Sequence, residues 1–167
     1  YTFAVGADGH PFLGHAGHRT FTAVTGSGGA RLRFSTASDD QIARDPAHFA
    51  AALHNVDLPP DALFSVRFGG GTWHQFAPLQ AGSRHPVLFA LSCHTDELGG
   101  LPHGPLQDAV LAGDATIATL TETLPAAVQA WLATHPAHGQ RIPTLRLPLP
   151  APPGSQQHPL CTGQRER

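Results

Sequence analysis

The stretch that most constrains the fold is residues 63–94, in which two apolar runs lie on either side of three consecutive glycines. The first run, residues 63–68, alternates apolar with other side chains, and both it and the second run, residues 87–91, are rich in the aromatic and β-branched residues typical of strands. Glycines at residues 69–71 weaken a strand unless the backbone bends sharply or is closely approached there. We therefore predict strands on both sides of a short polar break around Gly82–Ser83, which has the length of a hairpin connection, and a bend that projects His74 into a barrel interior.

The length favours a single domain. A chain of 167 residues can bury one sizeable core, which we assign to residues 1–149, and the proline-rich residues 150–167 predict a flexible tail. Pro and Gly, at 16 and 18 residues, favour turns and strands over long helices. No apolar run approaches a membrane span and no signal-peptide pattern is visible, so we expect a soluble, cytoplasmic protein.

The charge and the reactive residues exclude several classes of protein. The net charge is −2 and all ten basic residues are scattered arginines, which argues against binding to nucleic acid or to an anionic membrane. Cys93 and Cys161 have no metal-ligand spacing and predict no structural disulfide. The 12 histidines are more than a solvated surface needs, so histidine chemistry is the feature to follow.

Local patterns predict the remaining elements. Expected strands lie at residues 2–5, 20–25, 30–34, 116–120 and 141–149, with the second and third joined as a hairpin. A capping-box pattern at Ser38 and Gln41 predicts one or two short helices within residues 38–55. Apolar residues at helical spacing predict a C-terminal helix over 123–134, and residues 105–113 are compatible with another short helix.

The residues around the glycines resemble a known motif. Residues 69–76, GGGTWHQF, are similar to the second conserved motif of the cupin superfamily, whose core reads roughly P-x-G-x-x-H. Gly71 and His74 match this core, while Gly69 stands where proline is usual. In metal-binding cupins this histidine is a metal ligand, so the resemblance implies that role for His74.

The first cupin motif is matched only in part. It carries two histidines as H-x-H, then a glutamate, then an aromatic-aliphatic strand that ends in glycine, which residues 21–26 resemble. Counting back from that glycine, His15 falls on the second histidine, Leu13 on the first and Arg19 on the glutamate. The carboxylate of the usual metal site is therefore absent.

The resemblance covers residues 15–94, interrupted by the predicted helices. It implies a mostly β fold: a cupin-like double-stranded β-helix barrel that encloses a pocket, here with a short helical insert at about residues 38–55 and a C-terminal helix. Cupin pockets serve dioxygenases, isomerases and lyases as well as plain binding modules, so the fold leaves the function open.

The candidate metal ligands are His74, His15 and His18. Imidazole nitrogen suits divalent iron, zinc, manganese or nickel, and three ligands with an open position suit catalysis. A histidine after a turn is more often a hydrogen-bonded structural residue, and this alternative stays open for each of the three.

The candidate substrate-binding residues are Trp73, Phe76 and Arg67. The two aromatic residues would form the pocket wall or belong to an ordinary core, and Arg67 would bind an anionic substrate or lie on the surface. Arg31 and Arg33 share one strand face; inside a barrel they would clamp an anion, and outside they would be solvated.

Three functions are compatible with these residues. The leading hypothesis is a cupin-like small-molecule-binding protein, with a histidine-held divalent metal if it is an oxygenase or an isomerase/lyase. The alternative is a metal-free cupin-like binding or sensor module without catalysis. A third is a histidine-rich accessory protein that buffers metal at its surface. We expect a small-molecule ligand as partner, and edge strands that can pair make a homodimer reasonable.

Overall fold

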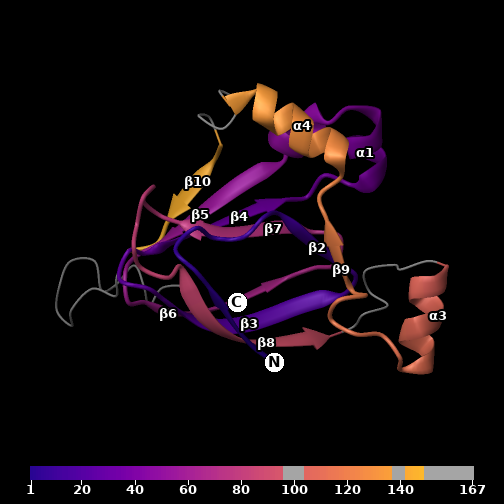
Figure 1. Cartoon of the computed structure of the whole chain (residues 1–167), viewed down its shortest axis with the longest axis horizontal. Helices are drawn as coiled ribbons and strands as arrows, with labels where there is room; N and C mark the ends of the chain where they lie inside the picture. Colours follow the sequence, from indigo (N-terminus) through magenta and orange to yellow (C-terminus); the bar gives the residue numbers. More distant parts are fainter. Residues whose placement is uncertain (96–103, 137–141, 149–167) are drawn as a thin grey trace, which may run out of the picture.

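The computed structural model describes residues 1–95, 104–136 and 142–148, and this part of the chain is mostly β (Figure 1). One antiparallel sheet has the order β1-β8-β3-β6, formed by Thr2–Val5, Leu88–Thr95, His18–Thr25 and Leu63–Phe68. The other has the order β10-β5-β4-β7-β2-β9, formed by Thr144–Arg146, Leu53–Leu58, Ala30–Ser35, Trp73–Pro78, Leu13–His15 and Thr121–Thr123. The described strands thus form two open sheets, and the predicted closed barrel is wrong because the edge strands of one sheet do not pair with those of the other.

The two sheets pack against each other around one apolar core. Phe21 of β3 and Leu88 of β8 meet Leu32 of β4 and Phe76 of β7, and all four side chains are at most 2% exposed. Each strand contributes every second residue, because successive side chains of a strand point to opposite faces. The alternation of residues 63–68 agrees with this arrangement, because Phe64, Val66 and Phe68 of β6 pack against the same core.

A second core lies on the far side of the larger sheet. Helices α1 (Asp39–Arg44), α2 (Ala47–Ala51) and α4 (Ala126–Thr134) supply the buried side chains of Ile42, Phe49 and Val128, which belong to one cluster with Trp73 of β7. Figure 1 shows α1 and α4 on the side of this sheet that faces away from β3 and β8. The capping box at the start of α1 is confirmed: Ser38 and Gln41 bond reciprocally.

Both predicted hairpins are wrong. β3 and β4 belong to different sheets, and β6 and β8 each pair with β3 rather than with each other. Each of these strands has an apolar inner face, so consecutive strands can bury those faces by crossing to the opposite sheet as well as by lying side by side. Gly26, at the end of β3, lies very close to the residues just before β8. A Cβ on Gly26 would be 1.9 Å from the Pro86 carbonyl oxygen.

Several boundaries also differ from the predictions. The helical insert ends at Ala51. The helices predicted within residues 38–55 therefore extend too far, because β5 begins at Leu53. Residues 116–120, predicted as a strand, are not one, and β9 follows them. The helix predicted over 123–134 begins only after Pro125, whose ψ of 140° is extended. The predictions of β1, of β10 within residues 141–149, and of α3 (Pro105–Ala112) are confirmed. The expected tail at residues 150–167 lies outside the described residues.

The glycine bend is confirmed and carries the chain from one sheet to the other. Gly71 has a φ of +72°, a conformation that L side chains rarely adopt, and a Cβ there would meet nothing within 4 Å. Glycine is therefore favoured at this position by the backbone conformation and not by a lack of space for a side chain. The bend connects β6 to β7, and its Gly71 N–H donates to the carbonyl of His15 at 3.2 Å. His74 is thereby placed beside the end of β2.

Candidate functional site

Three polar side chains from separate strands meet between the sheets: His15 at the end of β2, Arg19 on β3 and His74 on β7. They are 5%, 4% and 0% exposed. The two-residue alternation of β3 puts Arg19 on the same inner face as Phe21, and the pairing of Leu13 with His74 brings β2 next to β7. We call these three residues the arginine–histidine cluster.

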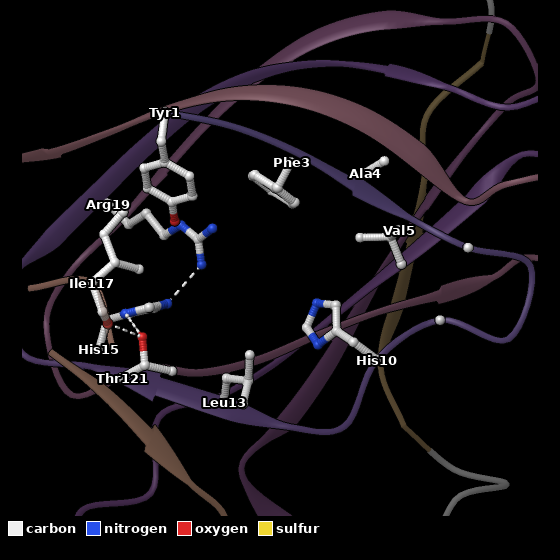
Figure 2. Close-up of a pocket in the computed structure, with 12 residues that line it drawn as sticks. Tyr1, Phe3, Ala4, Val5, His10, Leu13, His15, Arg19, Ile117 and Thr121 are labelled. Atoms are coloured by element: carbon white, nitrogen blue, oxygen red, sulfur yellow. Dashed lines mark hydrogen bonds between the residues drawn. The ribbon is translucent and has the colours of Figure 1, made fainter. Parts of the chain in front are cut away.

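The guanidinium of Arg19 connects the cluster. Its Nη1 donates to Nε2 of His15 at 2.7 Å and to Nε2 of His74 at 3.0 Å, while its Nε donates to the hydroxyl of Ser92 at 3.2 Å. The two imidazole rings are stacked, with centroids 5.1 Å apart and an interplanar angle of 22°. One amino group therefore lies at the point toward which both Nε2 atoms are directed. Figure 2 shows its bond to His15.

These bonds determine the tautomers of both histidines. Arginine can only donate, so each Nε2 must present its lone pair. The Thr121 hydroxyl donates to the Ile117 carbonyl at 2.6 Å, which leaves its oxygen to accept from Nδ1 of His15 at 3.2 Å. His74 then carries its proton on Nδ1, an atom without a hydrogen bond of ordinary geometry to any described residue.

Burial and the neighbouring cation keep the cluster histidine His74 neutral. Its pKa is held well below 6.5, chiefly by burial and then by the charge of Arg19 and the nearby imidazoles, with the Thr72 backbone carbonyl opposing in part. Burial also lowers the pKa of Arg19, and Tyr1 opposes that effect. A guanidinium stays protonated in spite of such a shift, so the cluster places a cation beside the neutral His74 at neutral pH.

A cavity of about 300 Å³ adjoins the cluster (Figure 2). Arg19 and His15 lie at one end of it, and its walls include Phe3, His10 and Leu13. The guanidinium carbon of Arg19 is 5.0 Å from the Phe3 ring centroid and 5.7 Å from that of Tyr1, which also lines the cavity. A buried cation is thus set among aromatic faces, where cation–π attraction partly offsets its lost hydration.

His10 is a cavity residue that the sequence interpretation did not identify. Its Nε2 accepts from the backbone N–H of Phe76 at 3.2 Å, so its Nδ1–H is left to donate to the carbonyl of Pro11 at 2.6 Å. Its pKa is lowered, mainly by burial, with the Pro11 carbonyl opposing and the Arg19 charge reinforcing the effect. Both ring nitrogens are therefore occupied, and His10 presents only the edge or face of its ring to a ligand.

The two aromatic residues predicted to line the pocket lie elsewhere. Trp73 packs on the helix side of the larger sheet, where a Cβ at Gly14 would be 3.2 Å from its ring. Phe76 is fully buried in the core between the sheets, where its ring lies 4.9 Å from that of His10, behind the cavity wall. Both fit the alternative of ordinary core residues, and Phe76 supports the pocket only indirectly.

His18 and Arg67 are also separated from the cluster. They occupy the outer face of the smaller sheet, where Nη2 of Arg67 donates to Nδ1 of His18 at 3.1 Å. The cause is the strand period: His18 directly precedes the inward-facing Arg19, so its side chain points the other way. The structure therefore brings together two of the three predicted metal ligands, His15 and His74, and leaves His18 outside.

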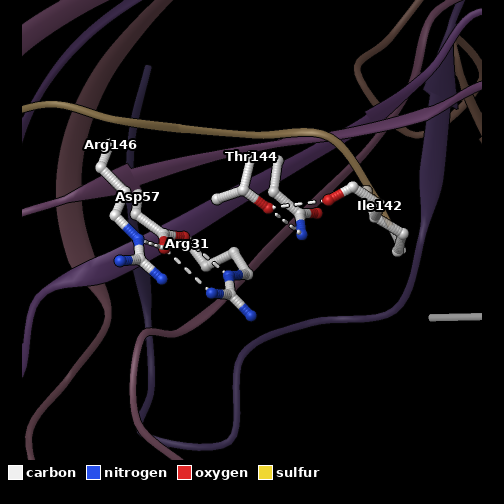
Figure 3. A network of polar contacts seen from close by, with 6 residues as sticks. Arg31, Asp57, Ile142, Thr144 and Arg146 are labelled. Atoms are coloured by element: carbon white, nitrogen blue, oxygen red, sulfur yellow. Dashed lines mark hydrogen bonds and ion pairs between the residues drawn. The ribbon is translucent and has the colours of Figure 1, made fainter. Parts of the chain in front are cut away.

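Arg31 and Arg33 face away from the core between the sheets. Arg31 makes a two-point ion pair with Asp57, at 2.7 and 2.9 Å, which raises the pKa of the arginine (Figure 3). Arg33 donates to Gln75 at 2.8 Å. A second cavity, of about 470 Å³, lies beside the Arg31–Asp57 pair and Arg146. Both arginines there have Asp57 as an ion-pair partner, whereas Arg19 has no acidic partner among the described residues.

The arginine–histidine cluster does not fit a divalent metal in this arrangement. His15 and His74 would supply two nitrogen donors, but the group at their common point is a guanidinium, whose positive charge repels a cation and whose N–H groups occupy both lone pairs. Within residues 1–95, 104–136 and 142–148, no three His, Cys, Asp or Glu side chains converge as a ligand set.

Comparison with protein-family models and with curated protein sequences gave no match. The similarity to cupins therefore stays a prediction based on the motif residues. No helix in the described part of the chain is long and apolar enough to cross a membrane.

The residue that most changes the interpretation is Arg19. In the comparison with the cupin motif, Arg19 only occupies the position where the motif has a glutamate. The alternation of residues 18–25 contains a further signal, because it puts Arg19 on the face of Phe21 and Ala23, both almost fully buried. An arginine on the apolar face of a strand is a candidate functional residue on that ground alone.

Proposed function

We propose that this chain is a cupin-like small-molecule-binding module without a resident metal, in which Arg19 stands where a metal-binding cupin has its ion. The observation that carries the proposal is the position of Arg19 Nη1, which bonds both His15 and His74 at the end of a cavity of about 300 Å³. That volume lies at the lower end of the range typical of ligand pockets, about 300–1,000 Å³.

The state of the histidines supports binding rather than acid–base catalysis. A general base needs a free lone pair within reach of its substrate. Nε2 of His15 and Nε2 of His74 are both engaged by Arg19, and the Nε2 of His10 is engaged by the backbone of β7. None of the three imidazoles therefore offers a free basic nitrogen to the cavity in this arrangement.

The experiment has two parts, both on protein without a histidine tag. First, metal content is measured after exposure to iron, zinc, manganese and nickel; we expect no stoichiometric uptake. Second, binding of benzene-sized probes, namely benzamide, benzoate and benzylamine, is followed by NMR shifts of the cavity residues. We expect at least one probe to bind, and Ile117→Trp, a change at a half-exposed residue of the cavity wall, to block it. If no probe shifts the cavity resonances, the binding proposal is wrong.

One observation favours a second candidate, a metal-dependent oxygenase or isomerase/lyase. Nε2 of His15 and Nε2 of His74 converge on a single point, which is the arrangement that two metal ligands require. The substitution Arg19→Glu tests whether the two histidines can hold a metal ion, because it returns a carboxylate to the strand position where the cupin motif has one. We expect Arg19→Glu to take up one metal ion and the wild type none. Stoichiometric metal in the wild type would instead support the enzyme, with Arg19 displaced.

A further inference from the structure

Arg19 has hydrogen-bonding capacity that the described residues do not use. A guanidinium has five N–H donors. The Nε donor binds Ser92, and the two of Nη1 bind His15 and His74. The two N–H groups of Nη2 make no hydrogen bond to any described residue. Arg19 itself lines the cavity, so these two donors are the ones available to a ligand.

Among the residues that the structure describes, Arg19 also has no acidic partner. No Asp or Glu among the described residues forms an ion pair with it, whereas Arg31 is paired with Asp57. Arg19 is 4% exposed, and removing a cation from water without an opposite charge is costly. A ligand that brings one negative charge to Nη2 would remove most of that cost, and a neutral ligand would not.

Two other polar residues of the cavity, His10 and Thr121, are already engaged. The nitrogens of His10 and the hydroxyl of Thr121 are bonded within the protein, and the remaining walls include Phe3, Val5 and Leu13. Figure 2 shows Phe3 and Leu13 around the space beside the guanidinium, with the Tyr1 ring next to Arg19. The cavity thus offers the Arg19 cation beside apolar side chains, and Tyr1 adds a hydroxyl to the wall.

From these three features we infer the class of ligand: a small monocarboxylate with an aromatic or short aliphatic body. The carboxylate accepts from Nη2 of Arg19, and the apolar body contacts Phe3 and Leu13. A single charge is favoured because a dianion would bury one uncompensated negative charge in the same apolar space. The inference rests on the proposed function, since it specifies the ligand of that binding module.

The test compares two probes of nearly equal shape, benzoate and benzamide, by titration calorimetry at neutral pH. A charge-assisted bond to a buried guanidinium should make benzoate bind about tenfold to a hundredfold more tightly than benzamide. Arg19→Gln should remove this preference while benzamide still binds. Arg67→Gln makes the same chemical change at the exposed arginine of the outer face, and should leave both affinities unchanged.

The outcomes separate the two proposals. Equal affinity of benzoate and benzamide for the wild type, or a benzoate preference that persists in Arg19→Gln, overturns the monocarboxylate inference and leaves the binding module standing. Failure of both probes, together with benzylamine, to bind overturns the proposed function itself. Because the wild-type comparison needs no substitution, the inference stays testable even where Arg19→Gln does not fold.

Discussion

The buried neutral His74 makes a quantitative prediction about stability at low pH. Its pKa in the folded protein lies well below 6.5, the ordinary value expected for the unfolded chain. Between these two values the unfolded state binds one more proton than the folded state, so the free energy of unfolding must decrease as the pH falls. Above about pH 6.5 the histidine is neutral in both states, and this contribution to the pH dependence disappears.

The expected size follows from the same linkage. One proton corresponds to about 1.4 kcal/mol per pH unit, so His74 should destabilise the protein by up to roughly 2 kcal/mol between pH 6.5 and pH 5. The assay is urea denaturation at a series of pH values from 8 to 5, on the wild type and on His74→Gln. Glutamine does not titrate, and its side-chain oxygen can still accept from Nη1 of Arg19.

The difference between the two proteins isolates the histidine, because other titrating groups contribute to both. We expect the difference in unfolding free energy to be constant from pH 8 to pH 7 and to narrow below about pH 6.5, as only the wild type loses the His74 contribution. Parallel curves down to pH 5 would refute the reasoning, since they would mean that His74 can take up a proton in the folded protein beside Arg19.

Two further predictions test the placement of residues. Trp73→Ala should lower the free energy of unfolding by about 3–5 kcal/mol, because it leaves a cavity in the core under the helices. His18→Ala, on the outer face of the smaller sheet, should change it by only about 0.5 kcal/mol. Urea denaturation measures both changes. Gly71→Ala should cost about 1 kcal/mol in backbone strain, while Gly26→Ala should cost more, because its Cβ would be 1.9 Å from the Pro86 carbonyl oxygen; equal losses would contradict this distinction.

The sequence allowed the local structure to be predicted better than the pairing of strands. Alternation separated the two faces of residues 63–68 and put Arg31 and Arg33 on one face, since burial follows directly from the two-residue period. It could not show which strands are neighbours, because an apolar strand face is satisfied equally by either sheet. The helix predicted over residues 38–55 extended into β5 for a different reason. No glycine or proline separates the end of α2 from the first residues of β5, so the sequence carries no signal that ends the helix there.

The candidate site was predicted in part. The motif residues His15 and His74 do meet, with ring centroids 5.1 Å apart, although they are 59 positions apart in the sequence (74 − 15). His18 does not join them, because the two-residue strand period points the side chain directly before Arg19 to the outer face. His10 had no sequence signal of its own, since its place in the cavity depends on its bond to the backbone of β7.

On our proposal, the position of Arg19 explains why two converging histidines favour an anionic ligand over a metal ion. Two neutral imidazoles with their lone pairs directed at one point attract any positive group, whether a metal ion or an N–H donor of a guanidinium. A glutamate on β3 would add negative charge and favour the metal ion. Arginine at that position supplies the positive group itself, is held in place by both histidines, and retains Nη2 for a ligand. On our proposal, the sign of one side-chain charge on the inner face of β3 therefore decides which kind of ligand the cavity takes.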